Sequence, residues 1–390
     1  MPDQCPSFLL VTSFYPEFLG ALYDLHPEWR DLGYIEQVDQ LLDCGFSAVG
    51  AYRHGLRRLG CHVDVVIVNA DEAQAAWARE NGFPMDDGGD VQERRRRVVQ
   101  AQIERLRPDV LYSFEWSPLG DAFFARVRKS ARLTVGQVAS PLPAGRTYAA
   151  YDLMISSVPP LVDHFRSRGI PSEPLRLAFD HRALSRIEEA GPAYDVTFIG
   201  GFAPSHDDRI PWLERLLRDL AVNVFGYGLE RVPAGSPIHA HYRGPCWGWA
   251  MYETLKRSRV TLNLHARIAT GRPDDGRYAN NMRLYEATGV GTCLVTDAKR
   301  NLAELFAPGR EVMTFGDVDE CVEVVRRLAA DKPLRRKLAL AGQRRTLEAH
   351  TYDRRMEELL GILRPRLGGT AGERRSTGDG KAGALLSPRP

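Results

Sequence analysis

The 390-residue sequence lacks several features that define common protein classes. It has no run approaching the roughly 20 apolar residues of a membrane span, and its N-terminus has no basic region followed by a long apolar stretch. Charged residues make up 26% of the chain and cancel to a formal +2, so nothing indicates a nucleic-acid partner. We therefore expect a cytoplasmic protein with no transmembrane segment and no nucleic-acid partner.

Cofactor and metal motifs are scarce as well. The first expected strand is not followed by GxGxxG, which argues against a nicotinamide-dependent enzyme. The six cysteines contain no CxxC pair, and several lie in apolar patterns, which indicates buried small hydrophobes rather than a disulfide framework or a zinc site. His239 and His241 fall in a loop-like segment, and the Asp pairs at 207–208 and 274–275 have no further acidic ligands nearby. We expect no metal and no cofactor.

Short apolar runs alternate with helical patterns along most of the chain, which predicts two Rossmann-like, doubly wound α/β domains. Strands are expected at 8–12, 62–68, 110–114, 134–138, 151–156, 175–179, 196–199, 222–225, 260–264 and 292–296. The pattern breaks at 184–194, which predicts the junction between domains. We assign 1–185 to the first domain, 186–350 to the second, 351–365 to a final helix, and 366–390 to a disordered tail.

One stretch, YANNMRLYEATGVGTCLVTD from Tyr278 to Asp297, combines several features of a phosphate site. Asn280 and Asn281 predict the start of a short helix, whose N-terminus would offer backbone N–H groups to an anion. Arg283 and Glu286 lie three residues apart on one face. A cation and a carboxylate there suit a diphosphate attached to a ribose. A surface helix with an i,i+3 ion pair explains these residues equally well.

A second turn of the same kind follows the strand at 196–199. Gly200 and Gly201 let the backbone approach a ligand, and the next helix opens with Arg209. Ser205, His206 and Arg209 are expected to point at a phosphate. The alternative is a tight turn in which the glycines serve only their backbone torsion angles.

The run RLYEATGVG, followed by TD, NLAELFAPGREVMTF and AGQRRTLEAHTYDRRMEELL, resembles the C-terminal half of group 1 glycosyltransferases. The resemblance extends from about Asp195 to Leu363. It implies the GT-B architecture, in which two Rossmann-like domains face one another across a cleft and the last helix crosses back to the first domain. It also implies that Glu286 holds the donor ribose. Many retaining members carry a Glu at the position of Tyr278, so the donor sugar and the stereochemical course do not carry over.

The resemblance implies a glycosyltransferase that moves a sugar from a nucleotide-diphospho-sugar to an acceptor hydroxyl without a metal. Arg209 is the catalytic candidate at the leaving phosphate, and Glu17 or Glu115 is the candidate base of an inverting enzyme. Glu17, Asp24 and His26 lie in an expected aromatic loop over 14–29 that suits an acceptor. The donor-binding candidates are Gly200, Gly201, His206, Arg209, Tyr227, His265, Asn280, Asn281, Met282, Arg283 and Glu286.

Two other functions remain open. A nucleotide-sugar epimerase shares this architecture and binds the same donor, but it needs no acceptor. A non-catalytic sugar-nucleotide-binding subunit would bind the donor without transfer or hydrolysis. The aromatic stretch over 14–29 favours an acceptor site, and therefore transfer.

Overall fold

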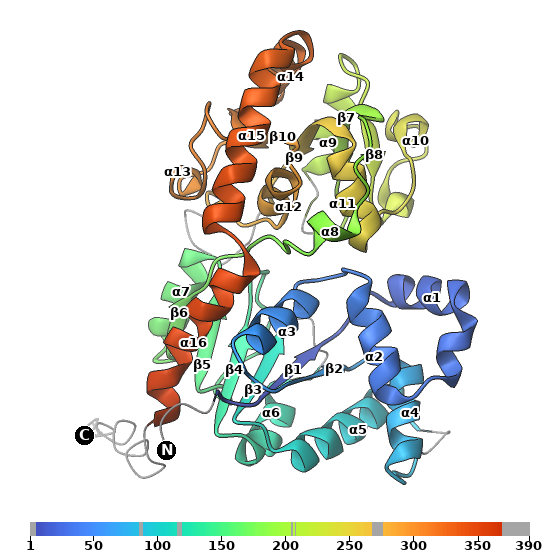
Figure 1. Ribbon diagram of the computed structural model, residues 1–390, viewed down its shortest axis with the longest axis vertical. Helices are drawn as coiled ribbons and strands as arrows, with labels where there is room; N and C mark the ends of the chain where they lie inside the picture. Colours follow the sequence, from blue (N-terminus) through green and yellow to red (C-terminus); the bar gives the residue numbers. More distant parts are fainter. Residues whose placement is uncertain are drawn as a thin grey trace, which may run out of the picture.

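The computed structural model describes residues 5–85, 89–114, 119–203, 206, 208–266 and 276–368. The sequence-based candidates Glu115, Ser205 and Asp207, the Asp pair at 274–275 and the expected tail from residue 369 onward lie outside these ranges. The described chain forms two parallel β-sheets with helices around each, one above the other in Figure 1. None of the helices within these ranges combines the length and hydropathy that a bilayer crossing requires.

The first sheet has the order β2-β1-β3-β4-β5-β6, and every neighbouring pair is parallel. Its strands are β1 (Phe8–Thr12), β2 (Val63–Ile67), β3 (Val110–Phe114), β4 (Leu133–Gln137), β5 (Leu153–Ser156) and β6 (Ser172–Pro174). Helices cover both faces, which explains why these strands read as apolar runs. The expected strand at 175–179 is wrong. The strand lies at 172–174, and Phe179 instead forms an isolated bridge with Thr351.

Helices occupy most of the segments between these strands. They are α1 (Pro16–Leu25), η1 (Pro27–Asp31), α2 (Tyr34–Asp43), α3 (Val49–Arg58), α4 (Asp71–Glu80), α5 (Val91–Leu106), α6 (Asp121–Val127), η2 (Arg128–Ser130) and α7 (Pro159–Arg166). The expected aromatic loop over 14–29 is wrong. Pro16 and Pro27 each open a helix, where a proline costs no hydrogen bond, and Phe18, Leu19 and Tyr23 form the buried side of α1.

The second sheet has the order β11-β10-β9-β7-β8 and is also parallel throughout. Its strands are β7 (Tyr194–Ile199), β8 (Asn223–Phe225), β9 (Ser258–Asn263), β10 (Cys293–Asp297) and β11 (Met313–Phe315). The strand order reverses between β7 and β9, because β8 lies on one side of β7 and β9 on the other. Doubly wound sheets bind ligands beyond the carboxyl ends of the strands at such a point.

The helices around this sheet are α8 (Ala183–Arg186), α9 (Arg209–Leu216), η4 (Leu229–Arg231), α10 (Ile238–His241), α11 (Gly248–Lys256), α12 (Arg283–Gly289), α13 (Leu302–Leu305), α14 (Val318–Ala330) and α15 (Lys332–Ala349). The segment around His239 and His241, expected to be a loop, contains the short helix α10.

The last helix, α16 (Tyr352–Gly368), leaves the second sheet and packs along the first (Figure 1). Tyr352, Met356, Leu359 and Leu363 are buried in the same apolar core as β1, β3 and α3. Gly55 of α3 allows this approach, because a Cβ there would lie 2.7 Å from Cγ of Met356. The helix continues to residue 368, past the expected start of the tail at 366.

The two halves also meet between the α2–α3 connection and α11. The Trp249 amide donates to the Cys44 carbonyl at 3.2 Å, and Nε1 of Trp249 donates to the Asp43 carbonyl at 2.5 Å. Gly248 has φ of +56°, and a Cβ at this position would lie 2.1 Å from the Cys44 oxygen. A side chain at residue 248 would therefore separate the two halves at this contact.

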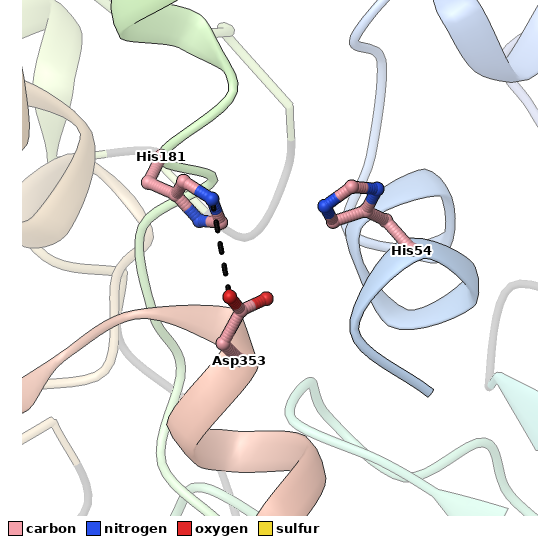
Figure 2. Close-up of side chains that lie close together, drawn as sticks. All are labelled: His54, His181 and Asp353. Atoms are coloured by element: carbon pink, nitrogen blue, oxygen red, sulfur yellow. Dashed lines mark ion pairs between the residues drawn. The ribbon is translucent and has the colours of Figure 1, made fainter. Parts of the chain in front are cut away.

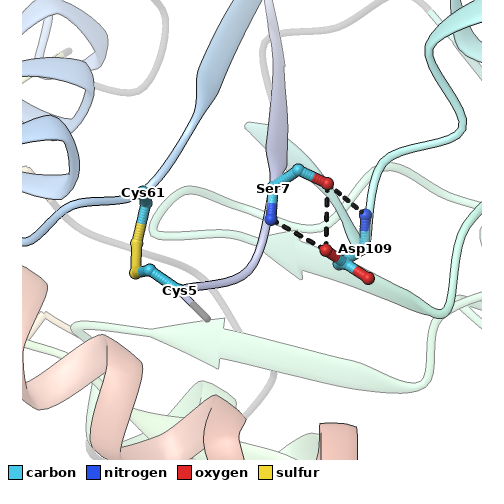
Figure 3. The surroundings of a disulfide bond; sticks show 4 residues. All are labelled: Cys5, Ser7, Cys61 and Asp109. Atoms are coloured by element: carbon cyan, nitrogen blue, oxygen red, sulfur yellow. Dashed lines mark hydrogen bonds between the residues drawn. A yellow bond between two sulfur atoms is a disulfide. The ribbon is translucent and has the colours of Figure 1, made fainter. Parts of the chain in front are cut away.

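The start of β1 is fixed to both neighbouring strands (Figure 3). Cys5 and Cys61 form a disulfide, which departs from the expectation that the cysteines are buried small hydrophobes. On the other side, the Ser7 amide and hydroxyl donate to the Asp109 carboxylate at 2.9 and 3.0 Å, and the Asp109 amide donates to Oγ of Ser7 at 2.9 Å. These contacts hold β1 between β2 and β3.

We predict that Leu359→Ala destabilises the protein by about 2–5 kcal/mol, because Leu359 is fully buried and the truncation leaves a cavity under α16. Urea denaturation followed by tryptophan fluorescence measures the loss. The control is Leu340→Ala, since Leu340 on α15 is 56% exposed and should cost little. Equal losses in the two variants would contradict the packing described for α16.

Candidate functional site

The candidate site lies where the strand order of the second sheet reverses. Arg209 opens α9, and its guanidinium spans the gap between the ends of β7 and β9. Nη1 donates to the Gly201 carbonyl at 2.6 Å, and Nη2 donates to the Leu264 carbonyl at 3.2 Å. One cation thus holds one backbone oxygen from each of the two strands at the reversal.

Arg209 is buried, and within the described ranges no carboxylate forms an ion pair with it. Burial and the nearby charge of Arg283 lower the pKa of Arg209 to about 10. The charges of Tyr227 and Asp297 act in the opposite direction but are outweighed. The guanidinium is still charged at neutral pH. A buried cation with only carbonyl partners favours the approach of an anion, because burial of a charge is costly without a counter-charge.

Several other polar nitrogen atoms of the candidate residues have no hydrogen-bond partner among the described residues. They are Nδ1 of His206, Nε of Arg209, Nε2 of His265 and Nε of Arg283, and all four are buried. Native proteins satisfy nearly all such groups, so a group of them in one region indicates a polar ligand. Burial, together with the charge of Arg209, lowers the pKa of His206 to about 4, which leaves its ring neutral at physiological pH.

His265 follows β9 and belongs to a buried polar network. Its Nδ1 donates to Oδ1 of Asp297 at 2.5 Å, and Nζ of Lys299 lies 2.9 Å from the other oxygen of Asp297. Burial raises the pKa of Asp297, but the hydrogen bond and charge of His265 and the charge of Lys299 outweigh it and lower the pKa to about 2. The ionised Asp297 fixes the His265 ring and leaves Nε2 as the atom available to a ligand.

Arg283 and Glu286 face one another on α12, with Nη1 of Arg283 2.8 Å from Oε2 of Glu286. Both side chains are largely buried, so this is not the solvated surface pair that the sequence left open. Burial raises the pKa of Glu286, and the charge of Arg283 opposes this. Nη1 of Arg283 also lies 3.0 Å from Sδ of Met251.

The expected anion site on the backbone of α12 is not available. Oδ1 of Asn281 accepts the Arg283 amide at 2.8 Å, so this asparagine caps the helix. The amides of Leu284, Tyr285 and Glu286 donate to the carbonyls of residues 281 and 282. Since the first-turn amides already have partners, an anion here must bind side chains instead.

Gly201 is required by close packing rather than by its torsion angle, and neither Gly200 nor Gly201 has a positive φ. A Cβ on Gly201 would lie 2.3 Å from the Tyr227 ring, and a Cβ on Gly226 would lie 2.0 Å from the Gly200 oxygen. Gly201 and Gly226 therefore allow the end of β8 to pack against the end of β7. Tyr227 in turn reaches the first half of the chain, since its hydroxyl lies 3.3 Å from that of Tyr15.

The remaining donor candidates lie around the start of α12. Nδ2 of Asn281 donates to Oδ1 of Asn263 at 2.8 Å, which joins it to the network around His265. Asn280 instead contacts the first half of the chain, donating to the Ala139 carbonyl at 3.2 Å and accepting from Oγ of Ser157 at 2.5 Å. Met282 contributes its carbonyl to two amides of α12. Direct ligand contacts of Asn280 and Met282 stay predictions.

Glu17 lies exposed in the first turn of α1, close to Tyr15. Burial raises the pKa of Tyr15 above its usual range, and the charges of Tyr227 and Glu17 raise it further. Glu17 therefore lies on the side of the first half that meets Tyr227. Asp24 pairs with Arg30, and His26 stacks on Trp29, so both have structural contacts. The base candidate Glu115 directly follows β3, outside the described ranges.

Sequence reasoning missed four residues of this region, namely Tyr15, Asn263, Asp297 and Lys299. Asn263 and Asp297 are the last residues of β9 and β10. Because carboxyl ends of parallel strands share one edge, the rule that selected His265 could also have selected these two. The contact of Tyr15 with Tyr227 has no signal in the sequence, since 212 residues separate them.

Comparison with known proteins agrees with this geometry. Residues 209–361 match the family described as glycosyl transferase-like, a range that includes Arg209, His265, Arg283 and Glu286. A search of curated proteins found no match.

Solved structures are similar over nearly the whole chain. AviGT4, a glycosyltransferase involved in avilamycin A biosynthesis, is 15% identical, with a TM-score of 0.55 over 94% of this chain and 99% of that one. HepE from Anabaena, crystallised with UDP-glucose, is 11% identical, with a TM-score of 0.57 over 92% and 100%. A glycosyltransferase from Rickettsia africae is 8% identical, with a TM-score of 0.57 over 94% and 100%.

The fold is the two-domain GT-B fold of glycosyltransferases, and residues 209–361 match a glycosyltransferase family model. The family match over residues 209–361 agrees with the resemblance to group 1 glycosyltransferases seen in the sequence.

The lowered pKa of Asp297 predicts an acid-dependent loss of stability. A carboxylate with a folded pKa of about 2 and an unfolded value of 3.8 contributes stability that is complete above about pH 4 and is lost as the pH falls through about 2. The contribution is roughly 2 kcal/mol. In Asp297→Asn the unfolding free energy, measured by urea denaturation, should fall less between pH 4 and pH 2. Asp163→Asn, at an exposed position on α7, should keep the wild-type profile.

Proposed function

We propose that this protein transfers a sugar from a nucleotide-diphospho-sugar to an acceptor hydroxyl, and that it does so without a metal at the phosphates. The observation that carries the proposal is Arg209, a buried guanidinium held by two carbonyls at the strand reversal of the second sheet. A diphosphate would supply the anion that this cation lacks among the described residues.

Departure of the sugar leaves negative charge on the diphosphate, and fixed donors aimed at that charge lower the barrier. Arg209 and Arg283 supply cationic N–H groups, and each has an Nε that has no partner among the described residues. His206 and His265, which follow β7 and β9, add ring nitrogens at the carboxyl ends of the strands. The cations already present can neutralise the leaving group, so added Mg²⁺ or Mn²⁺ should not raise turnover.

Glu286 is assigned to the donor ribose. Its carboxylate is buried and pairs with Arg283, so the two side chains orient one another. When a diphosphate engages Arg283, the carboxylate can accept hydrogen bonds from ribose hydroxyls. Charge-assisted bonds of this kind are stronger than neutral ones. The donor would thus bind to Arg283 and Glu286 side chains that already hold one another in position.

We place the acceptor against the first half of the chain. Glu17 is the base candidate with a described position, near the contact of Tyr15 with Tyr227. Glu115 is the alternative at the end of β3. An inverting enzyme requires one of these carboxylates, whereas a retaining enzyme can release the acceptor proton toward the departing phosphate.

The test is binding and turnover with a panel of nucleoside diphosphates and their sugars. UDP-sugars come first, because HepE was crystallised with UDP-glucose. A ligand that binds only the native state raises its melting temperature. Release of nucleoside diphosphate supports transfer or hydrolysis. Conversion of the donor sugar without release would indicate an epimerase, and binding without either would indicate a non-catalytic subunit. No binding of any nucleotide would overturn the proposal.

Glu286→Ala should weaken donor affinity by about 1–3 kcal/mol, because it removes charged hydrogen bonds to the ribose. Isothermal titration calorimetry with the nucleotide found above measures the change. Glu286→Gln keeps the side-chain shape and guards against a general folding defect. The matched control is Glu253→Gln on α11, whose carboxylate pairs with Arg257 at the surface. Unchanged affinity in both Glu286 variants would show that the ribose site lies elsewhere.

Arg209→Ala should lower kcat by roughly 100-fold or more while changing the donor Kd less, if the guanidinium acts on the leaving phosphate. Arg209→Lys keeps the charge but lacks the planar fork that holds two carbonyls, so it should fall between wild type and Arg209→Ala. Steady-state kinetics and calorimetry separate the two effects. A loss of affinity with turnover intact would make Arg209 an anchor rather than a catalytic residue.

A further inference from the structure

Three side chains of types that can ligate a metal meet at the junction between the two halves of the chain, and none of them is a donor-site candidate. His54 lies on α3, His181 lies just before α8, and Asp353 lies in the first turn of α16. One ligand atom from each residue lies within 4.8 Å of the others, and all three side chains are half-buried. Figure 2 shows the two rings and the carboxylate turned toward a common point.

We propose that His54, His181 and Asp353 form a zinc site. Two imidazole nitrogens and one carboxylate oxygen are ligands that Zn²⁺ prefers, and a water can complete the tetrahedron. Bond lengths of about 2.0–2.1 Å place the ligand atoms of such a site roughly 3.3 Å apart. Nε2 of His181 is 3.9 Å from Oδ2 of Asp353, so this distance needs to shorten only slightly to match a bound metal.

The backbone segments that carry the ligands are already fixed relative to one another. The Phe179 amide donates to the His350 carbonyl at 2.8 Å, and the Tyr352 amide donates to the Phe179 carbonyl at 3.1 Å. These bonds join the segment before His181 to the start of α16. On the other side, Gly55, next to His54, lets α16 pack closely on α3. A metal would therefore bind a preorganised set of ligands.

Two arginines lie near the cluster, and their charges must be compatible with a cation. Arg58 pairs with Oδ2 of Asp353 at 2.5 Å, but its side chain is 59% exposed and can turn into solvent. Arg182 is held by both oxygens of Asp180, at 2.9 and 2.6 Å, so its charge is already balanced. Oδ1 of Asp353 remains a second possible ligand atom.

No sequence pattern indicates this site, because His54 and His181 are 127 positions apart, and His181 and Asp353 are 172 positions apart. The ligands come from the first sheet's helix layer, the connection between the halves and the crossing helix. A bound ion would therefore stabilise the packing of α16, and of the segment before α8, against α3. The site is independent of the donor proposal, since it uses none of the donor-site residues.

The experiment titrates untagged, full-length protein with Zn²⁺ and, separately, with Co²⁺, whose visible absorption reports four-coordinate nitrogen and oxygen ligation. We expect one ion per chain and a rise in melting temperature with Zn²⁺ concentration. His54→Ala and His181→Ala should each weaken Zn²⁺ binding at least about tenfold. The control His62→Ala, an exposed histidine paired with Asp64 on β2, should bind as the wild type does.

Melting of each variant without metal, together with circular dichroism, separates loss of ligation from loss of fold. Asp353→Asn provides a third variant that keeps the side-chain shape. Absence of Zn²⁺ binding at one equivalent would overturn the proposal. So would equal binding by His54→Ala and His62→Ala, since the ion would then sit on other groups such as the free thiols. Stabilisation by inorganic phosphate that is lost in His54→Ala, with no stabilisation by Zn²⁺, would identify an anion site at this cluster and also overturn the proposal.

Discussion

A single buried guanidinium determines much of the arrangement around the candidate site. Arg209 joins the carboxyl ends of β7 and β9 through their carbonyls, at the point where the strand order reverses. Gly201 and Gly226 follow from the same geometry, because Tyr227 and the end of β8 must pack against the turn that Arg209 holds. Arg209 therefore both fixes the packing of the backbone at this point and supplies the charge of the site.

The charges around Arg209 explain why it is the attractive point for an anion. Arg283 is balanced by Glu286, and Lys299 is balanced by Asp297, in both cases within 2.9 Å. Among the described residues Arg209 has no such balance. Counted over the described residues, these three cations and two carboxylates leave one excess positive charge, on a side chain that is largely screened from water. In such surroundings electrostatic interactions are stronger than at the surface, so one unbalanced charge has a large effect on an anionic ligand.

Much of the fold could be predicted from the sequence, because strands buried on both faces appear as uninterrupted apolar runs. β1 and β3 occupy the predicted residues. The prediction of a loop over 14–29 is wrong, because a proline can either interrupt a helix or begin one. Here Pro16 and Pro27 each begin a helix. The sequence could place Arg209, Arg283 and Glu286 at helix starts, and the structure has them in the first turns of α9 and α12. The engaged amides of α12 and the cluster of His54, His181 and Asp353 could not be found, because both depend on contacts formed only in three dimensions.

Asn280 and Asn281 are consecutive, yet they serve different halves of the molecule. Asn280 is hydrogen-bonded to Ala139 and Ser157 of the first half, while Asn281 caps α12 and contacts Asn263. One peptide unit therefore connects the relative position of the halves to the start of the helix that carries Arg283 and Glu286. A displacement of one half relative to the other that breaks the contacts of Asn280 would therefore act directly on the start of the helix that carries the proposed donor-binding pair.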